Sequence, residues 1–235
     1  FELGPRGKLT GTKRAHGSAS VGFIYYSATK AGPMTASPRL VIFDMDGTLT
    51  QPCLDFARIR EEIGVDEPIL EAMAKMPPAA RSRAEAILER HEALAAENST
   101  LQPGAAEVVA AIRASGIPVV LMTRNSRRSV EALIARHDLT FDLVRTREDG
   151  EVKPSPAPIL SIGRRFETKP SRTWTIGDFH YDILCGAAAG AVTVLLLDPT
   201  ADRPVWAKEA DYVIHALREL PPLLGIEDAS LGRPT

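Results

Sequence analysis

Two aspartates, Asp44 and Asp46, directly follow a short apolar run at residues 39–43. Side chains two apart on an extended chain point to the same side, and Gly47 lets the backbone turn around a ligand. Two neighbouring carboxylates repel each other unless a cation joins them. A hard divalent cation that prefers oxygen ligands, above all Mg²⁺, would satisfy Asp44 together with Asp178.

Three later segments carry groups that fit such a site, each following an apolar run. They are Thr123-Arg124-Asn125 after residues 117–122, Lys153 in the loop after residues 141–145, and Asp178 with Asp182 after residues 173–176. In parallel sheets, ligands bind outside the carboxyl ends of the strands. We therefore expect these groups to converge on Asp44.

Together these groups suit phosphoryl transfer. Asp178 would share a metal ion with Asp44, Lys153 would neutralise a carboxylate or phosphate oxygen, and Thr123 would donate its hydroxyl to a phosphate. Backbone N–H groups around Gly47 can form an anion nest. One aspartate would attack phosphorus to give an aspartyl-phosphate. The other would protonate the leaving oxygen and then activate the hydrolytic water.

The segments Asp44-Met-Asp-Gly-Thr-Leu, Thr123, Lys153-Pro154 and Gly177-Asp178-x₃-Asp182 resemble, in this order, the four motifs of the haloacid dehalogenase (HAD) superfamily. The resemblance covers about residues 39–225. It implies that Asp44 is the nucleophile and Asp46 the acid/base, with Mg²⁺ held by Asp44, the Asp46 carbonyl and Asp178. The second aspartate of the first motif favours phosphatases over the dehalogenase branch. The sequence looks most like the phosphoglycolate phosphatase-like members of the superfamily. The segment inserted after its first strand, residues 52–100, is short for that subgroup.

Several of these residues also have purely structural interpretations. Asp182 is a further possible metal ligand, but an acid in the first turn of a helix is also favoured by the helix dipole. Arg124 and Asn125 are candidates for substrate or phosphate binding, together with Gly47, Thr123 and Lys153, while Asn125 could instead cap a helix. Arg58 and Arg60 could meet an anionic substrate or simply be solvated. Cys53 has no recognisable histidine partner, so catalysis by its thiol is not expected.

The elements that must position these residues alternate along the chain. Expected strands at residues 39–44, 117–122, 141–145, 173–176, 192–197 and 211–214 are separated by helical patterns at 103–114, 126–137, 155–166 and 181–189. This alternation predicts an α/β fold, a doubly wound parallel, Rossmann-like sheet. Residues 52–100 show only helical periodicity, and Pro68 and Pro77-Pro78 divide them into about three helices. We predict a core of residues 38–51 and 101–225, a small helical cap at 52–100 that matches a type C1 cap, and a tail at 226–235.

The composition is that of an ordinary globular chain. The 235 residues are 44% apolar and 25% charged, with a net charge of −2, so no nucleic acid partner is indicated. Two cysteines are too few for a disulfide framework or a cysteine-rich zinc site. The longest run of low polarity is too short to span a membrane. These features predict a soluble, cytoplasmic protein with no membrane partner and leave its oligomeric state open. The four motifs, and the family that they resemble, add a small phosphorylated metabolite as the expected partner.

Residues 1–37 differ from the rest, with five lysines or arginines within residues 1–36 and a single acid, Glu2. Such a basic leader can be an organelle transit peptide, which would move the protein from the cytoplasm to an organelle. The other interpretation is a disordered or non-native start, since no apolar period is sustained there.

Three alternatives to a phosphatase remain at this point. A phosphomutase would use the same core but return the phosphate to the substrate. A receiver-like signalling domain would also phosphorylate an aspartate, but there the acceptor follows the third strand, whereas Asp44 ends the first. The last alternative is a binding module without catalysis, against which the complete set of motifs argues.

Overall fold

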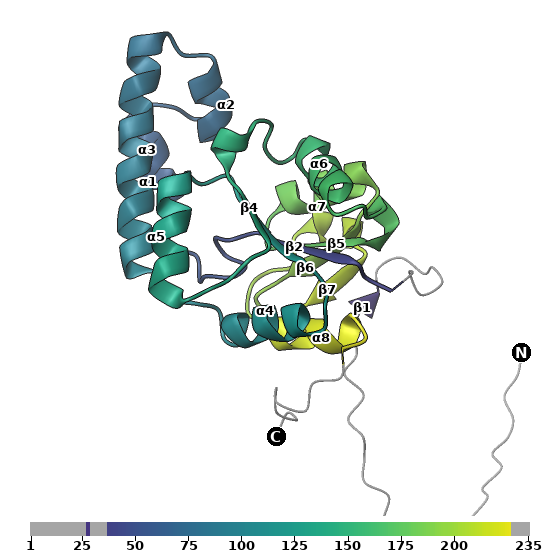
Figure 1. Ribbon diagram of the computed structural model, residues 1–235. Helices are drawn as coiled ribbons and strands as arrows, with labels where there is room; N and C mark the ends of the chain where they lie inside the picture. Colours follow the sequence, from purple (N-terminus) through teal and green to yellow (C-terminus); the bar gives the residue numbers. More distant parts are fainter. Residues whose placement is uncertain (1–26, 29–36, 227–235) are drawn as a thin grey trace, which may run out of the picture.

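The computed structural model describes residues 27–28 and 37–226. Its centre is a seven-stranded sheet in the order β1-β7-β6-β5-β2-β3-β4 (Figure 1). All neighbouring strands are parallel except β1, which runs antiparallel to β7. The strands are β1 (Ser27–Ala28), β2 (Leu40–Phe43), β3 (Val119–Met122), β4 (Leu143–Arg145), β5 (Thr173–Gly177), β6 (Val192–Leu196) and β7 (Tyr212–Ile214). The predicted α/β fold with a parallel sheet is confirmed.

Helices cover both faces of this sheet, as the near-continuous apolar strands require. On one face, Val41 and Phe43 of β2 pack in a core with α4 (Ala105–Ala114), α5 (Arg127–His137) and α8 (Leu220–Leu223). On the other face, Leu40 and Ile42 pack with α6 (Ala157–Arg165) and α7 (His180–Ala189). Short 3₁₀ helices connect the remaining elements: η1 (Arg147–Asp149), η2 (Pro170–Arg172), η3 (Val205–Glu209) and η4 (Leu217–Glu219).

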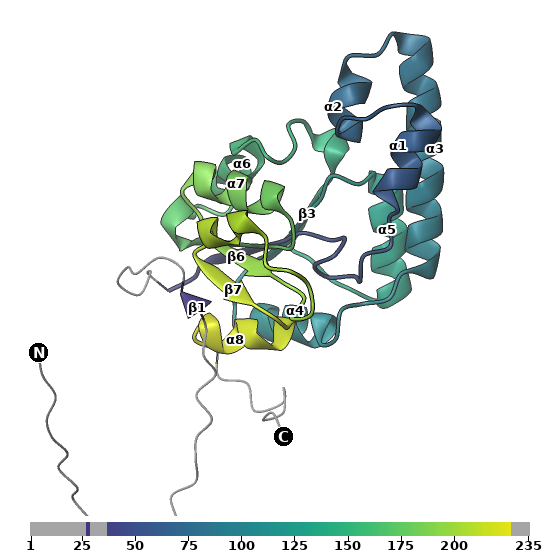
Figure 2. The same ribbon diagram turned by 180° about the vertical axis from the view of Figure 1, so that it is seen from behind.

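Three helices lie between β2 and α4, as the proline pattern predicted: α1 (Phe56–Ile63), α2 (Ile69–Ala74) and α3 (Pro78–Asn98). We call this group the cap. It has a small apolar cluster of its own, formed by Ile59, Ile69, Met73, Ala84 and Leu88. The long helix α3 lies beside α5 of the core in both views (Figures 1 and 2). The cap therefore joins the core along a helix as well as through its two chain connections.

The N-terminal region holds an element that the sequence did not predict. Ser27 and Ala28 form β1 and pair with Val213 and Tyr212 of β7, although both lie within the basic leader. Two residues are too few to show the alternation of apolar and polar side chains that predicts a strand. Ser27 and Ala28 are in a strand because they pair with the free edge of β7. The other leader residues up to 36, and residues 227–235 of the predicted tail, lie outside the described residues. Both interpretations of the leader and the domain boundaries stay predictions.

Within the described residues, none of the helices has the length and apolar character needed to cross a membrane. The cytoplasmic location stays a prediction.

Candidate active site

The site lies where the strand order reverses. Strand β2 has β3 on one side and β5 on the other. The chain leaves β2 toward β3 and leaves β5 toward β6, in opposite directions, which opens a crevice at the carboxyl ends of β2 and β5. Asp44 stands directly after β2, and its N–H donates to the carbonyl of Ile176 in β5 at 2.9 Å. Asp178 directly follows β5. The parallel pairing of these two strands therefore brings both aspartates to one place.

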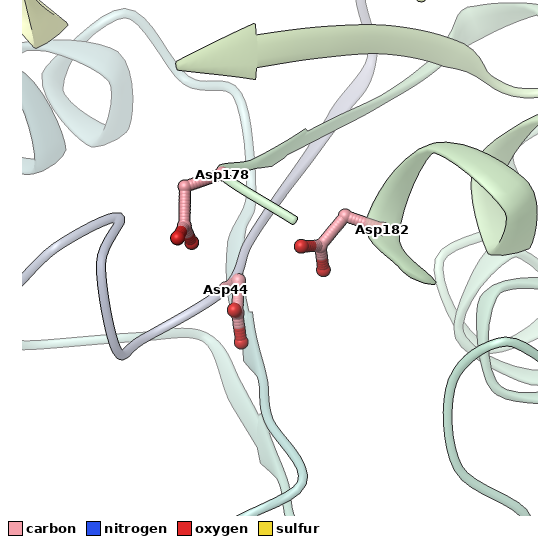
Figure 3. A group of neighbouring side chains, drawn as sticks. All are labelled: Asp44, Asp178 and Asp182. Atoms are coloured by element: carbon pink, nitrogen blue, oxygen red, sulfur yellow. The ribbon is translucent and has the colours of Figure 1, made fainter. Parts of the chain in front are cut away.

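Three carboxylates meet there: Asp44, Asp178 and Asp182 (Figure 3). Each offers an oxygen, and these oxygens lie within 4.8 Å of one another. Burial, reinforced by Asp44 and Asp182, raises the pKa of Asp178 to about 8. The side chains around Asp178 thus leave part of its negative charge uncompensated. A compact group of carboxylate oxygens whose negative charge is not fully compensated fits a hard divalent cation such as Mg²⁺.

Two glycines leave the space that this cluster needs. Gly47 has φ +83°, and a Cβ on it would lie 2.2 Å from Oδ2 of Asp178. A Cβ on Gly177 would lie 2.1 Å from Cγ of Asp182. Any other residue at either position would displace a carboxylate, so both glycines are part of the site's geometry.

Lys153 supplies the positive charge inside the cluster. Its buried Nζ lies 2.6 Å from Oδ1 of Asp44 and 2.6 Å from Oδ1 of Asp182. Burial alone would lower the pKa of Lys153, but Asp182 and Asp44 outweigh it and raise that pKa. Burial also raises the pKa of Asp182 to about 6, with Lys153 opposing the rise. The Lys153 ammonium is therefore shared between Asp44 and Asp182, and it forms no ion pair with Asp178.

Asp46 is held apart from the three clustered acids. Its Oδ1 accepts hydrogen bonds from the backbone N–H of Cys53 at 3.2 Å and from the Cys53 thiol at 3.3 Å. Burial raises the pKa of Asp46. Burial, together with the negative charge of Asp46, also raises the pKa of the Cys53 thiol to about 12. The thiol thus stays protonated as a donor, and the Asp46 carboxyl is biased toward the protonated form that a general acid needs.

Hydroxyl groups complete the core side of the site. Thr48 donates to Oδ1 of Asp178 at 2.8 Å and fixes that carboxylate. Thr123 is buried at the end of β3, and its Oγ1 accepts from the N–H of Asn125 at 3.2 Å. Ser126, not Asn125, is the N-cap of α5, so the capping alternative for Asn125 is wrong.

A pocket of about 680 Å³ lies between the core and the cap. All nine residues predicted for the site line it: Asp44, Asp46, Gly47, Thr123, Arg124, Asn125, Lys153, Asp178 and Asp182. From the cap side, the pocket is lined mainly by apolar side chains, including those of Leu54, Phe56, Ile69, Leu70 and Leu88. Four strand ends and one cap thus enclose a single space.

A family model described as haloacid dehalogenase-like hydrolase matches residues 38–190. The chain belongs to this hydrolase family. It is 31% identical over 205 residues to the haloacid dehalogenase-like hydrolase domain-containing protein At2g33255 of Arabidopsis thaliana, covering 79% of this chain and 83% of that protein. It is 32% identical over 140 residues to pyrophosphatase PpaX of Bacillus mycoides, covering 58% of this chain and 63% of that protein.

Solved structures of the HAD superfamily share the fold. A predicted phosphoglycolate phosphatase from Haemophilus somnus superposes with a TM-score of 0.63 at 18% identity, covering 80% of this chain and 98% of that one. At this identity the likeness concerns the fold. The expected HAD resemblance and the hydrolase class are confirmed.

Two acids of the cap that the sequence analysis missed join this hydrolase's cap to its core. Glu71 of α2 accepts both of its contacts from Arg124, at 2.8 and 2.7 Å. Arg124 also donates to the carbonyl of Lys153 at 2.6 Å and lies over the ring of Tyr181, 4.9 Å from its centroid. The predicted substrate-binding residue Arg124 is thus occupied by protein groups.

The second acid is Glu92 of α3, which pairs with Arg147 and accepts from the N–H of Ser126 at 3.2 Å. Glu92 is buried, and it stands in a series of buried positions four residues apart: Ala84, Leu88, Glu92 and Ala96. An acid in the middle of such a series was the available sequence signal. It marks a buried carboxylate that requires a partner.

The histidine within the fourth motif lies outside the pocket lining. His180 stacks on Trp206, with ring centroids 4.8 Å apart, and bonds to Glu209 at 3.0 Å. Its neighbours Phe179 and Tyr181 line the pocket instead. Neither aromatic residue was predicted from the sequence as part of the site.

Proposed function

We propose that this HAD-family hydrolase is a Mg²⁺-dependent phosphatase that cleaves a small phosphorylated metabolite through an aspartyl-phosphate on Asp44. The observation that carries the proposal is the shared space of Asp44, Lys153, Thr123 and Asp178 at four separate strand ends. Phosphoryl transfer to a carboxylate requires a nucleophile, a positive charge, a hydrogen-bond donor to the phosphate oxygens and a metal ligand. Asp44, Lys153, Thr123 and Asp178 would supply these groups in this order.

Each side chain has a role that follows from its contacts. The Asp44 carboxylate, held by Lys153, would attack phosphorus with its free oxygen, and Thr123 and Lys153 would hold the phosphoryl oxygens. Asp46 would give its proton to the leaving oxygen and then take one from the water that hydrolyses the aspartyl-phosphate. Mg²⁺ bound by Asp44, Asp178 and the Asp46 carbonyl would offset the negative charge that gathers between the carboxylates and the phosphoryl group.

The substrate class that we propose is a phosphoglycolate- or sugar-phosphate-like monoester. The pyrophosphatase and the predicted phosphoglycolate phosphatase among the similar proteins support phosphate chemistry. The core groups face only the phosphoryl end, so the cap side of the pocket would choose the rest of the molecule.

The test is release of inorganic phosphate from p-nitrophenyl phosphate by the full chain. We expect EDTA to abolish release and Mg²⁺ to restore it, while Ca²⁺ inhibits because it prefers more ligands and longer bonds. Full activity in EDTA would contradict the metal requirement.

The same assay tests the nucleophile. Asp44→Asn should lower turnover by orders of magnitude, whereas the matched change at the exposed Asp202 should not. Near-normal turnover of Asp44→Asn would contradict the role of Asp44 as the nucleophile. Return of phosphate to the substrate, without release, would identify a phosphomutase instead.

A further inference from the structure

Three cations line the pocket, and they differ in their partners. Lys153 contacts Asp44 and Asp182, while Arg124 is held by Glu71, by a backbone carbonyl and by an aromatic ring. Arg60 lines the same pocket, and its guanidinium has no hydrogen bond or ion pair to the described part of the chain. Arg60 therefore has its donors free to bind an anion.

The position of Arg60 on α1 places it toward the pocket by helix geometry. Phe56 and Arg60 lie four residues apart and share one helix face, and both line the pocket. Ile59 and Ile63 lie beside Phe56 on the adjoining part of the helix surface and pack in the apolar cluster of the cap, so Arg60 stands at the edge of the packed face. Arg58 lies about 160° from Arg60 around the helix axis. It is exposed and lines a separate hollow between α1 and α3. Of the two arginines on this helix, only Arg60 can meet a ligand in the pocket.

The pocket around Arg60 is larger and more apolar than a phosphate alone requires. Its volume of about 680 Å³ falls in the range that holds ligands of metabolite or drug size. Phe56 is 46% exposed and Phe179 is 55% exposed, and both line this space. These aromatic rings offer contact area to a carbon body that lies between the phosphoryl site and Arg60.

Asp66 is the other charged cap residue in the lining that carries no salt bridge within the described residues. Asp66 follows Arg60 closely in the chain, but the two residues form no ion pair with each other. An anion of the substrate is thus the partner that would satisfy the guanidinium, whose planar fork matches a carboxylate or a phosphate.

We propose that Arg60 is a specificity-determining residue that binds a second anionic group, at the end of the substrate remote from the phosphoryl group that is cleaved. The inference rests on the proposed phosphatase function and narrows its substrate class. The preferred substrates are phosphomonoesters with an apolar body and a distal carboxylate or phosphate. Arg60 contributes to binding both before and during the reaction, so it acts on KM more than on kcat.

The experiment compares matched esters with the full chain in Mg²⁺. One series consists of ω-phosphooxy carboxylates of increasing chain length, beginning with phosphoglycolate. The second series holds the corresponding uncharged amides, and the third the bisphosphates of the matching diols. At the preferred chain length, we expect kcat/KM to be about 10- to 100-fold higher for the charged ester than for its amide, as for a hydrogen bond to a charged group. The carboxylate and bisphosphate arms decide which anion is taken.

Arg60→Gln should remove this preference by raising KM for the charged ester about 10- to 100-fold, with kcat and the amide unchanged. Arg60→Lys keeps the charge but loses the planar fork, so it should restore only part of the preference. Arg58→Gln is the control, because it removes the same charge from the same helix but outside the pocket. The proposal is overturned if amides and charged esters are equally good substrates at every length, or if Arg58→Gln has the same effect as Arg60→Gln.

Hydrolysis of p-nitrophenyl phosphate in the same assay separates the two levels of the argument. If the wild-type enzyme releases phosphate from it in an Asp44-dependent way but shows no preference for a second anion, only the role of Arg60 fails. If it releases none from any ester, the phosphatase function fails, and the role of Arg60 fails with it.

Discussion

The core side and the cap side of the pocket are built in opposite ways. On the core side, Asp44, Asp182 and Lys153 are joined by contacts of 2.6 Å and are largely withdrawn from water. On the cap side, Phe56 is exposed and Arg60 has no partner within the described residues. Groups that are locked by neighbours are preorganised for one chemical step. Groups that are left unpaired are available to select a ligand.

The contacts that join the two sides differ in the same manner. Glu92 and Arg147 form a pair whose side chains are 2% and 12% exposed, whereas those of Glu71 and Arg124 are 37% and 19% exposed. Water screens the second pair far more than the first. The buried pair therefore fixes α3 to the core, and the more exposed pair of Glu71 with Arg124 is the contact of α2 that breaks at smaller cost.

The largest effect that separates the two sides concerns Asp46. If Asp46 is the acid/base, Asp46→Asn should slow phosphorylation of Asp44 by about 10²–10⁴-fold with an alkyl ester, whose alkoxide needs a proton. A nitrophenyl ester should lose much less, because its leaving group departs unaided. Slow hydrolysis of the aspartyl-phosphate should then give a burst with that ester. Rapid-quench kinetics measures both steps. Equal losses for the two esters, without a burst, would refute the role of Asp46.

A smaller effect, on stability, tests the buried anchor. Glu92→Gln keeps the shape of the side chain but leaves the largely buried Arg147 charge with only Glu148, at 3.8 Å, as an acidic partner. We expect the free energy of unfolding to fall by about 3–5 kcal/mol. Urea denaturation measures it, with the exposed Glu89→Gln on the same helix as the control. A loss no greater than that of the control would show that α3 is not fixed to the core by this pair.

The sequence predicted the core side well and the cap side poorly, for a physical reason. Parallel strands place their carboxyl ends together, so Asp44, Thr123 and Asp178 could be brought to one edge from the element order alone. Arg58 and Arg60 were equivalent candidates in the sequence. Only the rotation of α1 about its axis, set by the packing of its apolar face, directs Arg60 into the pocket.

Contacts between distant segments were also beyond the sequence pattern. The pairs of Glu71 with Arg124 and of Glu92 with Arg147 each join residues more than fifty positions apart. The occupied state of Arg124 follows from the first of these pairs, which no local periodicity encodes. The same holds for β1, whose two residues become a strand only because β7 offers them an edge.

The smallest expected effect is that of the less buried pair, Glu71 with Arg124, and it sharpens the comparison most. Glu71→Gln removes the same charge as Glu92→Gln, but from a pair that water already screens, so we expect a loss of at most about 1 kcal/mol in unfolding free energy. Because salt screens exposed pairs and hardly affects buried ones, that loss should shrink in 1 M NaCl, while the loss for Glu92→Gln should persist. Hydrogen exchange should rise in α2 for Glu71→Gln and leave α3 protected, since only the contact of α2 is weakened. Urea denaturation of both variants at low and high salt, with exchange measured on the same samples, decides the matter. If Glu71→Gln costs as much as Glu92→Gln, or if its cost is the same at both salt concentrations, the two anchors are equivalent, and the cap is held to the core equally firmly along α2 and α3.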